Sequence, residues 1–176
     1  PTTAAQYFHV LRRQVMRKFR KPLIIMTPKS LLRSPDVVSD LSEFDKGSFM
    51  PIIDETDKEL NKDPKSVERV ILCTGKIYYD LKKLRDEQSQ KVAIIRVEQL
   101  YPFDHAAAKK MVARYSGAKE VVWVQEEPQN MGGWSYILPL LDDILPARKK
   151  LSYIGRKYSG TTAEGFLKAH QVEQNR

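Results

Sequence analysis

The chain has 176 residues, a length that buries one sizeable core and fits a single domain. It is 41% hydrophobic and 30% charged, and no apolar run approaches the roughly 20 residues that a membrane helix needs. The net charge of +8 would attract polyanions, but lysines and arginines are scattered and not interleaved with stacking aromatics, so nucleic acid is not the expected partner. Because the sequence opens on Pro1 without a leader, we expect residues 1–176 to be one domain cut from a larger polypeptide.

The first predicted element is an amphipathic helix over residues 4–20, within an N-terminal segment, residues 1–22, that Pro22 ends. Phe8, Leu11, Val15 and Phe19 recur at helical spacing, which predicts a buried stripe. The wholly apolar run at 23–26 then predicts a short strand buried on both faces. Residues 27–68 are irregular and rich in proline, with a short helix expected near Leu31.

From residue 69 onward, apolar runs alternate with helical patterns. The expected strands are 69–73, 91–97, 120–125 and 151–154, and the expected helices are 78–87, 105–115 and 134–145, the last interrupted by Pro139. A polar tail, 155–176, carries a last helix near 163–170. This order predicts an α/β fold with three layers, a mostly parallel five-stranded sheet and helices on both faces.

Functional residues of such a sheet gather just after the strands, but the candidates there form no catalytic set. Gly75 and Lys76 open a helix without a complete phosphate-binding motif, so we interpret Gly75 as serving backbone geometry. Glu126 and Glu127 point to opposite faces of an extended chain and cannot act as an acid and base pair; hydrogen bonding within the following loop is their expected role. Cys73 lies in an apolar run and is expected to be buried.

Other reactive side chains also lack the context of a site. The three histidines are far apart and have no metal-binding spacing, and Asp104 is expected to cap the helix that begins at His105. Arg13, Arg17 and Arg20 fall on one face of the predicted helix, where guanidinium groups could grip a phosphate. A solvated face, with cations favoured near the end of a helix, is the alternative explanation.

Four separated strings resemble the closing portion of 2-oxoglutarate dehydrogenase, the thiamine-dependent decarboxylating component of a multienzyme complex. They are PTTAAQYFHVLRRQ at 1–14, MTPKSLLR at 26–33, VEQLYPF at 97–103 and VQEEPQNMG at 124–132. The string CTGKIYYD at 73–80 and the pair at 155–156 are similar to the family as well. The segment 98–104 also resembles carboxy-terminal domains of the transketolase type, whereas the loop 157–165 departs from the family pattern.

The resemblance implies a homodimeric oxidoreductase of the tricarboxylic acid cycle. Such an enzyme binds thiamine diphosphate and Mg²⁺, decarboxylates 2-oxoglutarate and passes the succinyl group to the lipoyl arm of a dihydrolipoyl succinyltransferase. The thiamine fingerprint, Gly-Asp-Gly followed by Asn, is absent here. The resemblance therefore implies that the cofactors bind upstream, that these residues include no catalytic, cofactor-binding or metal-binding residue, and that the fragment alone is inactive.

For this domain, the resemblance implies contacts with upstream domains and with the dimer mate. In some members it also implies an allosteric site for nucleotides such as AMP or acetyl-CoA, which we place at Arg12 and Arg13. Two alternatives remain open: the related 2-oxoadipate dehydrogenase component, and a basic module that binds polyanions through its net charge. The single cysteine indicates a reducing compartment, either the cytoplasm of a bacterium or the mitochondrial matrix of a eukaryote.

Overall fold

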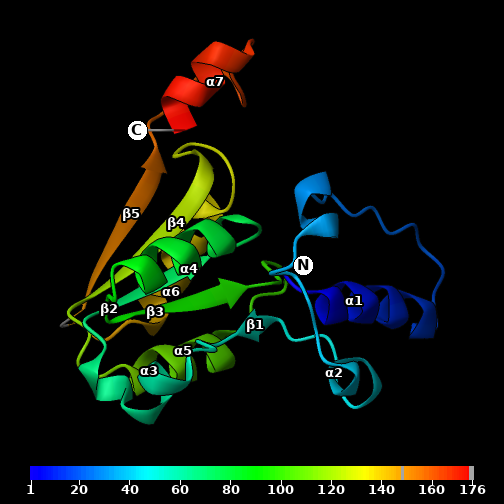
Figure 1. Cartoon of the computed structure of the whole chain (residues 1–176), viewed down its shortest axis with the longest axis horizontal. Coiled ribbons are helices and arrows are strands. Elements are labelled where there is room, and N and C mark those ends of the chain that lie inside the picture. The colour runs from blue at the N-terminus through cyan, green and yellow to red at the C-terminus, as the bar shows by residue number, and fades with distance from the viewer. Residues whose placement is uncertain (148, 175–176) are drawn as a thin grey trace.

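A computed structural model describes residues 1–147 and 149–174, and it has a five-stranded sheet at its centre (Figure 1). The strands are β1 (Ile52–Ile53), β2 (Arg69–Cys73), β3 (Val92–Val97), β4 (Glu120–Pro128) and β5 (Lys150–Arg156). Their order across the sheet is β1-β3-β2-β4-β5. All neighbouring pairs are parallel except β1 with β3. The predicted α/β class with a mostly parallel five-stranded sheet is confirmed.

Helices cover both faces of this sheet. They are α1 (Ala4–Met16), α2 (Leu41–Asp45), α3 (Lys58–Lys62), α4 (Ile77–Glu87), α5 (His105–Arg114), α6 (Trp134–Ile144) and α7 (Leu167–Gln174), with 3-10 turns at Lys29–Arg33 and Pro64–Ser66. Helix α4 packs on one face, and α5 and α6 pack on the other. Right-handed crossovers explain this division, because the chain moves outward from β2 to β3 and then back across β2 to β4.

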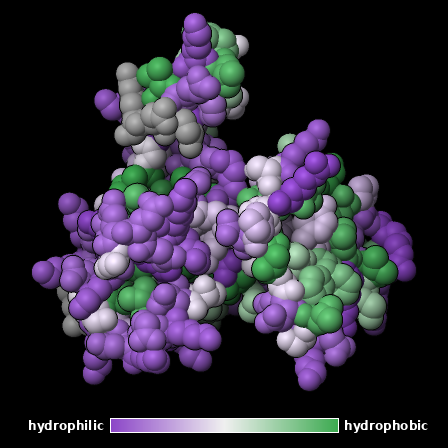
Figure 2. All heavy atoms as spheres, viewed as in Figure 1, coloured by the Kyte–Doolittle hydropathy of each residue, from purple (hydrophilic) through white to green (hydrophobic). Residues whose placement is uncertain are grey.

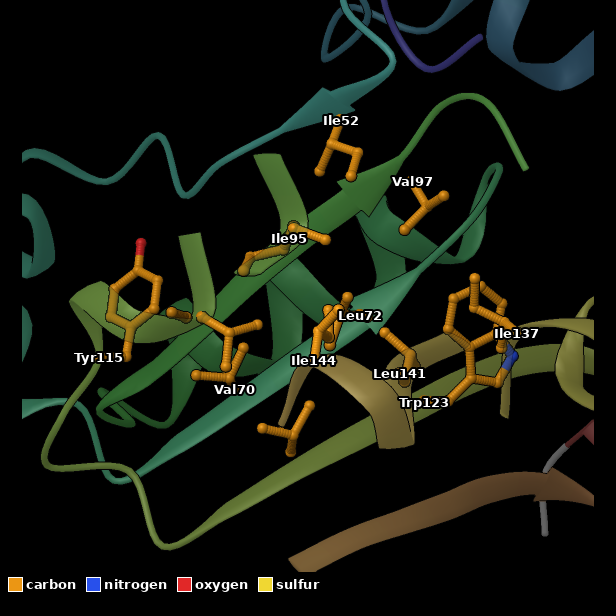
Figure 3. Close-up of a cluster of buried hydrophobic side chains, with 14 of the residues drawn as sticks. Ile52, Val70, Leu72, Ile95, Val97, Tyr115, Trp123, Ile137, Leu141 and Ile144 are labelled. Atoms are coloured by element: carbon orange, nitrogen blue, oxygen red, sulfur yellow. The ribbon is translucent and has the colours of Figure 1, made fainter. Parts of the chain in front are cut away.

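The core follows the period-two alternation of side chains along the strands. Leu72, Ile95 and Trp123 point to the face covered by α5 and α6, where Ile137 and Leu141 meet them (Figure 3). The intervening strand residues, such as Cys73 and Ile94, point to the α4 face. Burying a large apolar side chain contributes about 1.5–3 kcal/mol. The larger α5–α6 cluster is therefore the main source of stability.

The run at 23–26 is not a strand, so that prediction was wrong. Ile24 and Met26 are more than 80% exposed. The place beside β3 is taken instead by β1, whose Ile52 pairs with Val97 in the antiparallel direction. A short apolar run forms a strand only if the rest of the fold places it beside a sheet edge, and hydropathy does not indicate where in the fold a segment lies.

Helix α1 is also shorter than the predicted helix and buries another face. It ends at Met16, because Arg17 is already extended with ψ of 145°. Its buried residues are Ala5, Gln6, His9 and Val10, whereas the expected apolar stripe stays partly or largely exposed. The docking face is selected by hydrogen bonds of Gln6 rather than by hydropathy.

The later helices match the sequence more closely. Helix α6 runs through Pro139 without a break, and Asp104 caps α5 by accepting a hydrogen bond from the Ala107 amide at 2.9 Å. Helix α7 begins at Leu167, about one turn later than expected. The preceding Glu164 is held by both carboxylate oxygens to Arg156, each at 3.0 Å, which keeps this stretch out of a helix.

A buried ion pair locks the short β1 segment against the sheet. The Glu55 and Arg85 side chains are 1% and 5% exposed, with Nη1 of Arg85 2.6 Å from Oε2 of Glu55. The same carboxylate oxygen accepts the Ile94 amide at 2.7 Å, and Oε1 accepts the Thr56 and Asp57 amides. The Glu55 carboxylate thus accepts a backbone amide of β3 beyond the point where β1 stops pairing with that strand.

Glu55→Ala is expected to lower the free energy of unfolding by about 3 kcal/mol, because it removes the buried carboxylate of Arg85 and leaves only the partly exposed Asp86 as its anion. Urea unfolding of both proteins measures the difference. Glu59→Ala is the matched control, since its ion pair with Lys62 is exposed and is expected to contribute less than about 1 kcal/mol. Equal losses for the two variants would contradict the role given to Glu55.

Candidate functional site at the carboxyl edge of the sheet

The topological switch of the sheet, where open α/β folds bind ligands, lies between β2 and β4. Lys76, directly after β2, forms an ion pair with Glu126 of β4 across this point. Gly75 has φ of 76°, a conformation that favours glycine, so the turn uses it for backbone geometry. Lys76, the lysine that a phosphate would need, is therefore already paired with a carboxylate of the domain itself.

A polar network over the carboxyl end of β3 joins the N-terminal segment to the sheet. Thr2, 1% exposed, donates to Glu98 through its backbone nitrogen at 2.9 Å and through its hydroxyl at 2.5 Å. The same hydroxyl accepts from Nη1 of Arg96 at 3.0 Å, and the Thr2 carbonyl accepts from the Tyr79 hydroxyl. We call these four residues the Thr2 network.

Gln6 extends this contact to the segment before β1. Its side-chain amide exchanges two hydrogen bonds with the backbone of Met50, donating at 2.7 Å and accepting at 2.9 Å. Its backbone nitrogen donates to the N-cap Thr3 at 3.1 Å. A buried glutamine in this way imitates a strand partner, and it fixes how α1 lies on the sheet edge.

The two arginines expected at a nucleotide site occupy different surroundings. Nη1 of Arg13 donates to Gln99 at 2.6 Å, and the guanidinium lies 4.1 Å from the centroid of the Phe49 ring. Burial, followed by the neighbouring Arg17, lowers the pKa of Arg13. Arg13 lines a cavity of about 240 Å³ together with Glu98 and Gln99. Arg12 is exposed and does not line that cavity.

The predicted stripe of Arg13, Arg17 and Arg20 does not form, because the helix ends before the last two. Nη1 of Arg20 donates instead to the carbonyl oxygens of Arg17 at 2.7 Å and of Val15 at 3.3 Å. Arg20 therefore serves the last turn of α1, as cations near a helix end commonly do. The sequence offered this explanation as the alternative to phosphate binding.

Gln125, which the sequence did not single out, organises the loop after β4. Its Oε1 accepts from Nε1 of Trp123 at 2.9 Å and from the Trp134 amide at 3.0 Å. Its Nε2 donates to the Met131 carbonyl at 2.7 Å. Glu127 accepts from Nε2 of Gln125 with its backbone carbonyl oxygen. The loop hydrogen bonds that were expected from the carboxylates of Glu126 and Glu127 are therefore made by the buried side-chain amide of Gln125. The available signal was a glutamine at the end of the apolar run 121–125, three residues before the Pro-Gln-Asn-Met-Gly-Gly segment.

The loop 157–165 is tied back to this same region. The Asn130 side chain exchanges hydrogen bonds with the backbone of Ser159, donating at 2.9 Å and accepting at 3.1 Å. With the ion pair between Arg156 and Glu164 at 3.0 Å, this gives the loop two anchors. The atypical sequence of the loop is thus accommodated by local polar contacts.

Reactive side chains lie apart in the described part of the chain. Cys73 is fully buried, and burial raises the pKa of its thiol to about 12. Buried His9 lies 2.7 Å from the Glu43 carbonyl, whereas His170 lies beside Glu164 near the other end of the chain. Among the described residues, no three His, Cys, Asp or Glu side chains gather to hold a metal, and no helix is long and apolar enough to cross a membrane.

The sequence profile of the 2-oxoglutarate dehydrogenase C-terminal family matches residues 38–176. The chain belongs to this family. It is 49% identical to the 2-oxoglutarate dehydrogenase E1 component of Shouchella clausii and 48% identical to that of Cupriavidus necator. The matches cover 99% of this chain but 19% and 18% of those proteins, so the chain spans about a fifth of their length.

Gln125→Leu is expected to lower the free energy of unfolding by about 3 kcal/mol, because each buried group left without a partner costs about 1–3 kcal/mol. Urea unfolding gives the change, and amide hydrogen exchange at Trp134 reports whether the loop has loosened. Gln171→Leu, at an exposed position of α7, is the control and is expected to change stability by less than about 0.5 kcal/mol. An unaltered Trp134 exchange rate would show that Gln125 does not hold this loop.

Proposed function

We propose that the chain is the carboxy-terminal domain of a thiamine-dependent 2-oxoglutarate dehydrogenase. The complete enzyme decarboxylates 2-oxoglutarate and transfers the succinyl group to the lipoyl arm of a dihydrolipoyl succinyltransferase. The observation that carries this proposal is the family match, with identities near one half to E1 components over nearly the whole chain. The enzyme would work in the cytoplasm of a bacterium, or in the mitochondrial matrix of a eukaryote.

The cofactors of this reaction would be thiamine diphosphate and Mg²⁺. The thiamine fingerprint, Gly-Asp-Gly followed by Asn, is absent from these 176 residues. Lys76, at the switch point, is paired with Glu126. We therefore assign both cofactors to the other four fifths of the enzyme, and no step of the decarboxylation to a residue of this domain.

The role proposed for the domain itself is to pack against the upstream domains and the second subunit of a homodimer. Figure 2 shows apolar side chains gathered over the lobe that α1 and α2 form, whereas the body around the sheet is mainly polar in the same view. The exposed apolar residues of this lobe include Phe8, Leu11, Val15, Met16 and Leu41. Contiguous apolar surface on a folded domain marks a surface that another protein surface covers.

The basic residues do not favour the alternative of a polyanion-binding module. Several are neutralised within the domain, as in the ion pairs of Arg69 with Glu120, Arg114 with Asp54, and Arg156 with Glu164. Lys82 and Arg85 share Asp86. These ion pairs leave the net charge of +8 unchanged, but they take several basic residues out of any continuous cationic surface.

The full-length protein is expected to decarboxylate 2-oxoglutarate when thiamine diphosphate and Mg²⁺ are supplied, and residues 1–176 alone are expected to show no turnover. Reduction of an artificial electron acceptor measures the reaction, and omission of thiamine diphosphate is the control. A preference for 2-oxoadipate would reassign the substrate. Full turnover by the 176-residue chain would contradict the assignment of the cofactors to the rest of the enzyme.

We place an allosteric nucleotide site at Arg12 and Arg13, beside the cavity that Arg13 lines. In the full-length enzyme, Arg12→Ala and Arg13→Ala are each expected to raise the AMP or acetyl-CoA concentration needed for half-maximal activation about tenfold, the loss of a charge-assisted contact. Arg13→Ala is also expected to lower stability, since Arg13 contacts Gln99 and Phe49. Lys18→Ala, at an exposed position, is the control. Unchanged activation curves for both arginine variants would remove the site.

A further inference from the structure

The N-terminal lobe, residues 1–50, lies beside the hydrophobic core of the domain rather than within it. Among the described residues, both core clusters begin after the lobe, the first of them with Ile52. The lobe is held to the sheet by polar contacts, such as those of Thr2 with Glu98. Figure 1 shows it as a separate body beside the strands. Residues 1–50 are therefore attached to this domain without sharing its core.

The lobe carries an apolar stripe on α1 that the domain leaves uncovered. Phe8, Leu11 and Val15 recur at helical spacing, and each is at least 41% exposed. Met16, at the end of the helix, is exposed as well. Amphipathic helices of globular proteins bury such a stripe against another layer of the fold. The stripe therefore fits a packing layer that the described residues do not supply.

The apolar run at 23–26 has the composition of a buried strand but no partner strand. Ile24 and Met26 are more than 80% exposed. Within the described part of the chain, no backbone hydrogen bond joins residues 23–26 to another segment. Unpaired backbone groups resist burial, so an apolar run of this kind is buried only where another strand pairs with it. The run thus presents apolar side chains and unpaired backbone groups at one place.

Helix α1 and the run at 23–26 have the order and spacing of one unit of a parallel α/β sheet. The connection between them, 17–22, has the length common in such units, about 2–6 residues. In these sheets a helix packs on one face, and the strand that follows is buried on both faces. The uncovered stripe and the unpaired run are then two parts of one contact. A helix face alone would suit many partners, whereas the two together fit the edge of a sheet.

The family match divides the chain between the lobe and the sheet. The 2-oxoglutarate dehydrogenase C-terminal profile begins at residue 38, after α1 and the run at 23–26. The similarity to E1 components nevertheless covers 99% of this chain, so residues 1–37 also have counterparts in those proteins. About four fifths of the length of those proteins lies outside the match. This division supports an assignment of residues 1–37 to a different structural unit of the polypeptide.

We propose that residues 1–37 complete the domain that precedes this one in the full-length polypeptide. Residues 23–26 pair with an edge strand of that domain's sheet, and the stripe of α1 packs on the face of the same sheet. The contact of Thr2 with Glu98 is then a contact between two domains. This inference rests on the proposed packing against upstream domains but not on the proposed reaction. Neither hydrogen exchange nor thermal unfolding depends on turnover, so the two proposals can fail separately.

Amide hydrogen exchange of the full-length protein and of the 176-residue chain tests the pairing. Peptides that cover 23–26 are expected to exchange about 100-fold more slowly in the full-length protein, because the strand amides become paired and buried. Peptides of β2, which is paired on both sides within this domain, are the control and are expected to exchange alike in both proteins. Equal exchange of 23–26 in the two proteins would overturn the proposal. Protection that rises with the concentration of the 176-residue chain would assign the surface to a second copy, and would also overturn it.

A charged side chain at position 24 tests the same contact through stability. Ile24→Asp is expected to leave the thermal midpoint of the 176-residue chain unchanged, because Ile24 is exposed there. In the full-length protein the same change is expected to lower the first unfolding midpoint by about 4 °C or more, because it buries a carboxylate without a partner. Val172→Asp, at an exposed position of α7, is the control and is expected to shift neither midpoint. Equal shifts for the two variants in the full-length protein would contradict the buried strand.

Discussion

The hydrogen-bonded contact of Thr2 with Glu98 holds the N-terminal lobe on the carboxyl edge of the sheet. Helix α1 offers little apolar burial of its own, since Ala5 and Val10 are its only buried apolar residues among those described. Polar pairs from Thr2 and Gln6 therefore decide where the helix lies. The position of Arg13 beside Gln99 and the apolar surface that α1 turns outward both follow from how this helix lies.

This arrangement bears on the carboxyl edge of the sheet, where folds of this kind commonly bind ligands. The edge is occupied by structural contacts: the Lys76–Glu126 ion pair at the switch point, the Thr2 network over β3 and the Gln125 amide after β4. Each satisfies buried polar groups that would otherwise destabilise the domain. The chain belongs to the 2-oxoglutarate dehydrogenase C-terminal family and spans about a fifth of the length of its relatives. Most of the length of those relatives therefore lies outside the region that matches this domain.

The contrast between Arg85 and Arg96 follows from the same constraint. Both arginines are buried, Arg85 within α4 and Arg96 in β3 beside it, and Arg85 is paired with the carboxylate of Glu55. Glu55 lies two residues after the end of β1, and its carboxylate accepts the Ile94 amide as well. Arg96, two residues after Ile94 in β3, meets the N-terminal lobe, where its Nη1 donates to the Thr2 hydroxyl.

The sequence by itself determined the parallel strands, the helices between them and the family, because burial on both faces leaves continuous apolar runs and because long strings of residues carry a resemblance. It also indicated that Cys73 is buried and that Asp104 caps α5. Only the tertiary structure decided that Ile52–Ile53 rather than residues 23–26 forms the edge strand, which face of α1 is buried, and how Thr2, Gln6 and Gln125 are used. These features arise from hydrogen bonds between residues far apart in sequence, such as Thr2 with Glu98, and hydrophobic periodicity carries no trace of such partners.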